Sequence, residues 1–274
     1  MNKKINLLIG LMGVLPFAAN AAVVDRGNGL VYDDVLNVTW AADFDLAATL
    51  GYNAETRAFN DANAGTSLTT DSIFTHEEAK LFADDLNTFG YAGINTWTLP
   101  QLTGVDLSNT TYSADGTTGR SYNNTDISSP LSHLHYVSLG AIGNRDTSGS
   151  STGCYSSSSG NSCLVDTANA SLSLFANIGA VSSTDTAAQT VLFYEQDLLD
   201  ANGDPKGPTT EAWALVVSTG LQDARNDTNA AAGGGGRALV YAVGDVAAVP
   251  VPAAAWLFGS AMLGLLVCGR KQSA

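Results

Sequence analysis

The chain has 274 residues, and 45% of them are hydrophobic, an ordinary fraction for a folded protein that excludes wholesale disorder. Its charge is lopsided, with 12 Lys and Arg against 26 Asp and Glu and a net charge of −14. Four basic residues lie at the extreme termini: Lys3, Lys4, Arg270 and Lys271. The rest carries 8 basic and 26 acidic residues, a net charge of −18 that repels phosphate backbones and excludes nucleic acid as a partner.

The first 21 residues have the three parts of a secretory signal peptide. Two lysines open the segment, a short apolar run follows, and Ala19 and Ala21 place small residues at positions −3 and −1 of a cleavage site. We therefore predict that residues 1–21 are removed on export and that the mature chain starts at Ala22.

Residues 22–246 read as one domain without a clear linker, and two helices are predicted within it. Thr75 and Glu78 have the spacing of a capping box, and apolar residues follow with helical periodicity, which predicts a helix over 76–88. A second helix is predicted from Ser129-Pro130 to residue 139, because serine caps a helix well and proline fits its first turn.

Strands are predicted where β-branched and aromatic residues gather between turn residues. These segments are 29–34, 38–40, 97–100, 190–194, 211–218 and 237–243. Strands and two helices in irregular order, with long loops, predict an α+β fold.

Five short segments, in this order, carry a resemblance to a known family. They are Gly-Leu-Val-Tyr-Asp-Asp-Val-Leu-Asn-Val-Thr-Trp at 29–40, Thr-His-Glu-Glu-Ala at 75–79, Gly-Tyr with Trp-Thr-Leu-Pro in 90–100, Leu-Ser-His-Leu-His-Tyr-Val-Ser-Leu-Gly at 131–140 and Ala-Leu-Val-Tyr-Ala-Val at 238–243. With them the chain resembles the DUF1566 or Lcl C-terminal-like domain over most of 24–246. The resemblance implies a single C-type-lectin-like domain with long loops. Thr98 stands where the family has arginine.

Cys154 and Cys163 enclose eight residues. In an oxidising envelope compartment this spacing favours a loop disulfide over two free thiols. Cys268, in the apolar C-terminal segment, has no evident partner.

One acidic segment has the oxygen ligands of a calcium loop. Asp200, Asn202 and Asp204 lie at alternate positions, and Glu211 falls at the twelfth position of an EF-hand count. Pro205 occupies the position where an EF-hand needs glycine, which excludes that motif. The segment is therefore either a looser Ca²⁺-binding loop or an acidic, solvated hairpin loop. No other cofactor is expected.

No sequence pattern predicts a catalytic centre. The three histidines are His76, His133 and His135, and on a helix the last two point about 200° apart, which prevents chelation. We expect each histidine to be satisfied by its own partners. Residues 149–153 fit G-x-S-x-G without the strand and helix that a nucleophile elbow needs, and the glycine run 233–236 precedes a predicted strand rather than a helix.

Residues 249–271 have the organisation of a membrane-anchoring tail. Sixteen residues, 253–268, contain no charge, and counting from Val249 gives the 20 residues that span a bilayer. Trp256 suits the outer interface, and the final basic pair suits the cytoplasmic one. A plain C-terminal anchor is the simplest interpretation of these features.

The order of these features is more specific than an anchor requires. The residues that define this order are Val249, Pro250, Val251, Pro252, Trp256, Arg270 and Lys271. Val-Pro-Val-Pro-Ala-Ala-Ala-Trp-Leu-Phe-Gly-Ser, an apolar helix and a basic end resemble the PEP-CTERM sorting signal of Gram-negative bacteria, in its VPxPA form. The resemblance implies processing by the membrane protease exosortase.

These features together predict a non-enzymatic cell-envelope protein. It is expected to be exported, held in the inner membrane by its C-terminal helix, and released to the cell surface or matrix by exosortase. The lectin-like resemblance implies association with exopolysaccharide or surface glycans. An adhesin carrying the same domain binds sulfated glycans, but a charge of −18 argues against that preference here. The alternative is an envelope hydrolase that uses a pair of carboxylates.

Overall fold

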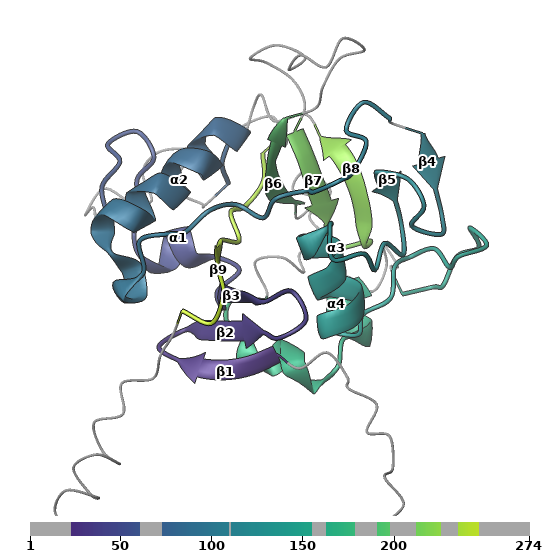
Figure 1. The fold of residues 1–274 in the computed structure, drawn as a ribbon, viewed down its shortest axis with the longest axis horizontal. Helices are drawn as coiled ribbons and strands as arrows, with labels where there is room; N and C mark the ends of the chain where they lie inside the picture. The colour runs from purple at the N-terminus through teal and green to yellow at the C-terminus, as the bar shows by residue number, and fades with distance from the viewer. Residues whose placement is uncertain are drawn as a thin grey trace, which may run out of the picture.

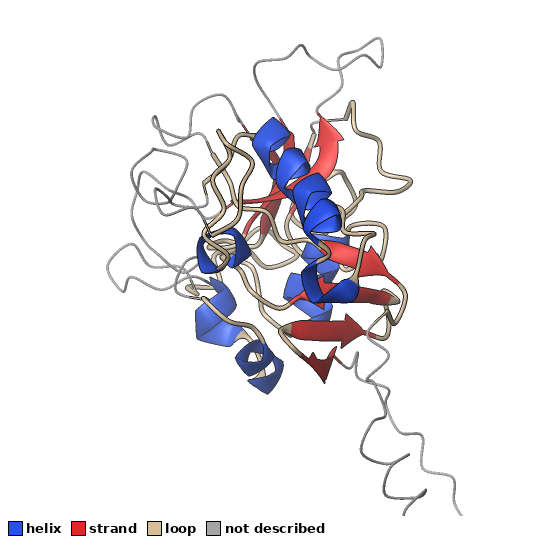
Figure 2. Cartoon of the chain, turned by 90° about the vertical axis from the view of Figure 1, so that its left-hand side faces the viewer, coloured by secondary structure: helices blue, strands red, loops and turns tan. Residues whose placement is uncertain are grey.

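The computed structural model describes residues 23–60, 73–109, 111–154, 163–178, 191–197, 212–225 and 235–246. They form a mixed α and β protein with two sheets, as predicted at this level (Figure 1, Figure 2). Within these ranges no helix is both long and apolar enough to cross a membrane. The signal peptide, the acidic segment at 200–211 and the tail at 249–271 lie outside the described residues.

The first sheet joins the beginning of the described chain to its end. Its strands are β1 (Val23–Gly27), β2 (Leu30–Asp33), β3 (Val38–Ala41) and β9 (Tyr241–Val243), in that order, and all neighbours are antiparallel. An ion pair between β1 and the residues after β9 reinforces this closure, because Arg26 Nε donates to Asp245 Oδ1 at 3.1 Å. Residues 23 and 246 therefore lie at the same end of the molecule.

The second sheet has the order β4-β5-β8-β7-β6. Its strands are β4 (Tyr112–Ser113), β5 (Arg120–Ser121), β6 (Val191–Asp197), β7 (Ala212–Val216) and β8 (Leu221–Arg225). Only β4 and β5 are parallel; the other neighbours are antiparallel.

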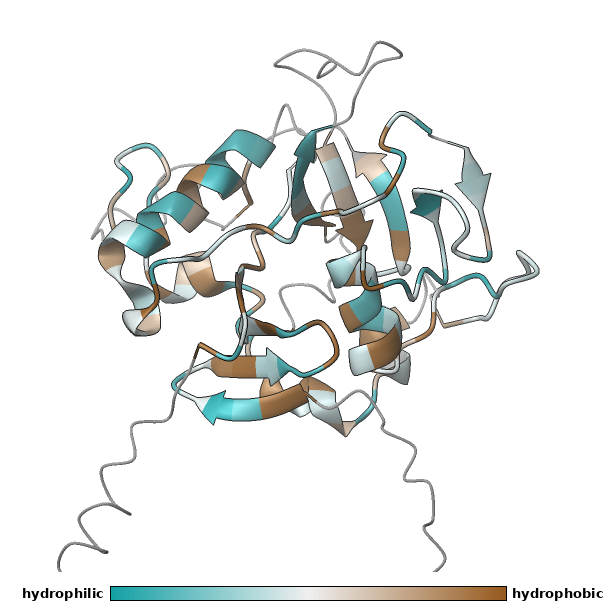
Figure 3. Ribbon diagram, viewed as in Figure 1, coloured by the Kyte–Doolittle hydropathy of each residue, from teal (hydrophilic) through white to brown (hydrophobic). Residues whose placement is uncertain are grey.

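The helix predicted over 76–88 is confirmed as α2 (His76–Phe89). Its capping box is complete, since the Thr75 side chain accepts from the Glu78 amide and the Glu78 side chain accepts from the Thr75 amide. Gly90 ends it with a left-handed φ of 71°, which glycine adopts at little cost. Figure 3 shows hydrophilic residues along the exposed side of this helix.

The second predicted helix is present, but it changes character along its length. Pro130–His133 is α-helical (α3), and Leu134–Ser138 continues it as a π-helix (η2). The Ser129 side chain makes no capping hydrogen bond. The remaining short helices are α1 (Leu46–Thr49), η1 (Tyr91–Gly93), α4 (Cys163–Thr167) and η3 (Ala170–Leu174).

Several strand predictions need correction. Thr98, in the predicted strand 97–100, makes only an isolated bridge to Tyr241, and the predicted strand 237–243 is regular only over β9. β1, β4, β5 and β8 were not predicted. β8 contains the polar pair Gln222 and Asp223, so it lacks the β-branched and aromatic content that marks a strand.

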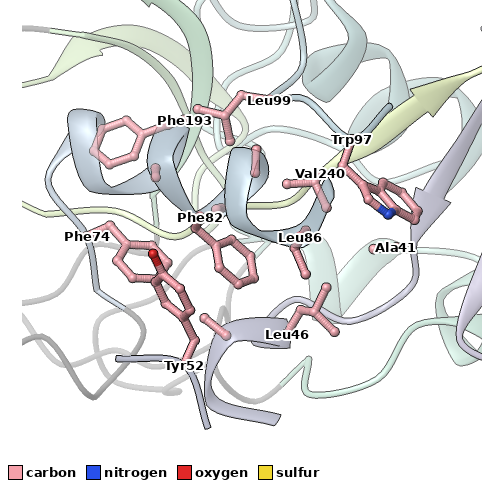
Figure 4. Close-up of a cluster of buried hydrophobic side chains, with 14 of the residues drawn as sticks. Ala41, Leu46, Tyr52, Phe74, Phe82, Leu86, Trp97, Leu99, Phe193 and Val240 are labelled. Atoms are coloured by element: carbon pink, nitrogen blue, oxygen red, sulfur yellow. The ribbon is translucent and has the colours of Figure 1, made fainter. Parts of the chain in front are cut away.

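Within the second sheet, the first four residues of β6 and all of β7 are buried, and their alternate residues enter two different cores. In β6 and β7 one set, which includes Tyr194 and Trp213, joins a core with α3, η2 and α4. The other set, which includes Phe193, joins a core with α1 and α2. Figure 4 shows the second core, in which Phe82 of α2 lies beside the rings of Tyr52 and Phe74. The sheet is thus a middle layer between two groups of helices.

Candidate functional site

A polar cleft of about 300 Å³ is lined by the residues that connect β4 to β5 and by neighbouring loops. The two strands are at the upper right of Figure 1. Its polar side chains include Asp106, Asn109, Thr117, Asn124, Asp126 and Ser128. Of the described residues that line this cleft, none is aromatic and none is basic. The volume is at the lower end of the range for small-ligand pockets.

Asn124 ties the cleft to the protein interior. It is only 5% exposed; its Nδ2 donates to Ser129 Oγ at 3.0 Å, and its Oδ1 accepts from the Asp126 amide at 3.0 Å. The Thr103 amide donates to the Ser128 carbonyl at 3.0 Å and closes the loop on the other side. The cleft walls are therefore held by hydrogen bonds that exist before any ligand arrives.

Two glycines allow the chain to approach itself closely here. Gly116 has a φ of +80°, and a Cβ at that position would lie 2.6 Å from the Asn123 carbonyl oxygen. A Cβ on Gly119 would lie 3.0 Å from Val105 and 3.1 Å from Trp213. Any larger residue at Gly116 would need a strained backbone and would push the wall outward.

The cleft is negatively charged at neutral pH. The Ser108 hydroxyl and amide lower the pKa of Asp106, and the Ser128 amide lowers the pKa of Asp126. Both carboxylates are therefore anions that accept hydrogen bonds. A general acid for glycoside hydrolysis needs a raised pKa, so neither carboxylate suits that role.

The cleft residues were not predicted from the sequence, although a repeated local pattern marks them. Asp106, Asn109, Asp115 and Asp126 each accept a hydrogen bond from the amide two residues later, which is Ser or Thr in every case. Such Asx turns shape loops without forming strands or helices. A search for clustered Asp/Asn-x-Ser/Thr would have found this region.

His133 and His135 contact different backbone carbonyls, but each keeps one buried ring nitrogen, Nε2 of His133 and Nδ1 of His135, without a partner among the described residues, so the expectation that each histidine is satisfied holds only in part. His133 Nδ1 lies 3.0 Å from the Thr125 carbonyl oxygen, and His135 Nε2 lies 3.4 Å from that of Ile142. His76 begins α2, in another part of the fold. Burial lowers the pKa of all three histidines, to about 4 for His135.

The structure joins Cys154 to Cys163 by a disulfide. Both cysteines are buried, and the bond connects the loop after η2 to the start of α4. The candidate calcium ligands Asp200, Asn202, Asp204 and Glu211 lie outside the described residues, as do all positions of the signal peptide and the sorting signal.

A scan against protein-family models found no match, and neither did searches of curated proteins and of solved structures.

Proposed function

We propose that this chain is an exported cell-envelope protein that binds a hydroxyl-rich, uncharged glycan in its polar cleft. The observation that carries this proposal is the cleft itself, with its fixed acceptors and its lack of basic residues among the described lining. Carboxylate and amide oxygens accept hydrogen bonds from sugar hydroxyls, and charged acceptors make the stronger bonds. An exopolysaccharide of neutral sugars fits this chemistry better than a sulfated one.

The position of the cleft supports presentation to an extracellular ligand. The first sheet, where residues 23 and 246 lie, is at the lower end of Figure 1, and β4 and β5 are near the upper end. A membrane anchor attached after residue 246 would therefore leave β4 and β5, and the cleft beside them, at the end of the described protein away from the attachment point. The long loops around β4 and β5 also support a C-type-lectin-like architecture, which we propose for this domain.

Binding is better supported than hydrolysis. The two cleft carboxylates have lowered pKa values, whereas burial raises the pKa of Glu195, which lies on β6 and not among the cleft residues. A glycoside hydrolase would need one carboxyl group with a raised pKa and one with a lowered pKa, on either side of the glycosidic bond.

Export and sorting are part of the same proposal and are supported by the sequence of the two ends. The signal peptide directs the chain across the inner membrane, and the tail with the VPxPA-like motif holds it there for exosortase. The mature protein then resides at the cell surface or in the matrix.

Calorimetry on the mature protein with neutral and sulfated polysaccharides tests glycan binding. We expect a neutral glycan to bind and Asp106→Ala to weaken the affinity about tenfold, because a charged hydrogen-bond acceptor is lost. Asp146→Ala is the matched control: Asp146 also accepts from the amide and hydroxyl two residues later, but it is not among the cleft residues. Equal affinities for Asp106→Ala and Asp146→Ala would contradict the proposal, as would preference for the sulfated glycan.

A further inference from the structure

We propose that His76, Glu77 and Asp197 form a binding site for a divalent transition-metal ion such as Zn²⁺. The three residues come from the start of α2 and the end of β6, which lie next to each other at the top of Figure 1. Their ligand atoms all lie within 4.8 Å of one another. This group is separate from the polar cleft.

The environment of His76 determines which ring nitrogen carries the proton. Its side chain is fully buried, and Nε2 lies 2.7 Å from the Tyr194 carbonyl oxygen. A carbonyl only accepts, so Nε2 must donate, and the neutral ring has its lone pair on Nδ1. Histidines that bind metals are commonly oriented in this way, with the second nitrogen donating to a backbone carbonyl.

The lone pair of His76 Nδ1 then points at another acceptor. Asp197 Oδ1 lies 3.0 Å from Nδ1, and no donor to Nδ1 is present among the described residues. Two acceptors at this distance repel each other unless a cation lies between them. A proton on Nδ1 would make the ring a buried imidazolium, which desolvation disfavours. A metal ion satisfies both atoms and leaves the ring neutral.

The geometry fits an ion of this size. Two ligands about 2.1 Å from a tetrahedral ion are about 3.4 Å apart, so the 3.0 Å between Nδ1 and Oδ1 needs to open only slightly to admit one. Glu77 has a 72% exposed side chain, so it can move inward to supply a third ligand. One imidazole nitrogen and two carboxylates favour Zn²⁺ or Mn²⁺ over Ca²⁺, which prefers oxygen ligands alone.

Lys80 competes for the same carboxylates. Its Nζ lies 3.0 Å from Glu77 Oε1 and 3.6 Å from Asp197 Oδ2. The ammonium group and the positive end of α2 both oppose a cation here, while the two carboxylates favour it. Metal binding therefore displaces the Lys80 side chain outward, and removing its charge should increase the affinity.

Titration of the metal-free mature protein with ZnCl₂ and with MnCl₂ tests the site by calorimetry. We expect one ion per chain for at least one metal. Glu77→Gln and Asp197→Asn should each weaken binding at least tenfold, while Lys80→Met should strengthen it. Both ligand variants are at the surface, so they test the site even if a His76 variant fails to fold. Asp84→Asn is the matched control, because Asp84 is an exposed carboxylate on the same helix and is not in the ligand group.

Three results would overturn the proposal: no binding at millimolar metal, equal affinity in wild type and Asp197→Asn, or an equal loss in Asp84→Asn. In each case the group is an ion-pair network organised by Lys80. These results do not depend on the glycan experiment, which uses residues of the polar cleft.

Discussion

The side chain of Tyr194 links the interior of the second sheet to the polar cleft. Its hydroxyl donates to Gln222 Oε1 at 2.7 Å and accepts from the Ser132 amide at 3.1 Å, and Gln222 Nε2 donates to the Gly119 carbonyl in the cleft wall at 2.7 Å. All of these side chains are buried, and burial raises the pKa of Tyr194. The network stabilises one arrangement of α3, β8 and the cleft wall, because any other arrangement leaves buried groups without partners.

Protonation of His135 on unfolding should make the stability of the protein depend on pH. The ring is buried among apolar residues such as Phe44 and Leu164, and its pKa is lowered from 6.5 to about 4. The unfolded state takes up a proton near pH 6.5 while the folded state does not, so stability falls between about pH 6.5 and pH 4. The loss reaches up to about 3 kcal/mol for a shift of this size.

Urea unfolding at pH 7.5 and pH 4.5 measures this effect. Wild type should lose more stability than His135→Gln over this range, because the variant keeps His76 and His133 but lacks the histidine with the pKa of about 4. The comparison uses the difference between the two pH values, so a constant packing defect in the variant cancels. A wild-type pH dependence that is unchanged in His135→Gln would show that other groups are responsible.

At the scale of elements, α2 and the α3–η2 helix show two ways in which local sequence sets a helix. The ends of α2 are both satisfied locally, by the capping box at Thr75 and the left-handed Gly90. The second helix has no capping side-chain bond and widens into a π-helix, in which the Leu139 amide donates to the Leu134 carbonyl. Its buried residues, rather than its ends, hold it against the first core.

The capping box of α2 predicts a measurable stability contribution. Thr75→Ala should reduce the free energy of unfolding by about 1 kcal/mol, because the Glu78 amide loses its acceptor. Thr88→Ala is the matched control on the same helix: Thr88 is exposed, and its hydroxyl only bonds back to the Asp84 carbonyl. Its effect should be within a few tenths of a kcal/mol, since alanine favours helix. Urea denaturation monitored by circular dichroism compares the two; equal losses would mean that the cap contributes nothing.

At the scale of the whole molecule, the antiparallel pairing of β3 with β9 places the beginning and the end of the described chain together. The strands β4 and β5, whose connecting residues line the polar cleft, lie near the other end (Figure 1). This arrangement suits a protein that is attached through one end and binds through the other. It also means that removal of the C-terminal segment need not disturb the cleft.

The sequence of the C-terminal segment predicts that exosortase cleaves the exported protein. From the sequence we expect Pro250 and Pro252 to keep the chain before the apolar run out of a regular helix, so that a membrane protease would meet an extended backbone there. In a host with exosortase we expect mature protein to lack everything from about Val251 onward. Replacing both prolines by alanine should make uncleaved protein accumulate in the inner membrane. Intact-mass spectrometry measures this, and a mature mass that still includes Trp256 through Lys271 would identify an ordinary anchor.

The sequence by itself determined the features that depend on neighbouring residues. The α2 helix follows from Thr75, Glu78 and an apolar stripe within 14 residues, and the Cys154–Cys163 pairing follows from a short spacing. The mixed α and β class was predictable because strand and helix patterns are also local. The β8 strand was not predictable from its own residues, because it forms by pairing with β5 and β7 on either side of it.

Only the tertiary structure decided which side chains meet. His76 and Asp197 are 121 residues apart, and they meet because the two-sided burial of β6 packs one of its faces against α2. The polar cleft needs the loop at 104–109 to close on the segments around β4 and β5, which are held by Gln222 and Asn124. Hydrogen bonds between near neighbours can be predicted from the sequence alone. The His76–Asp197 contact and the polar cleft arise because apolar surface is buried on both faces of a sheet, and that burial depends on the whole fold.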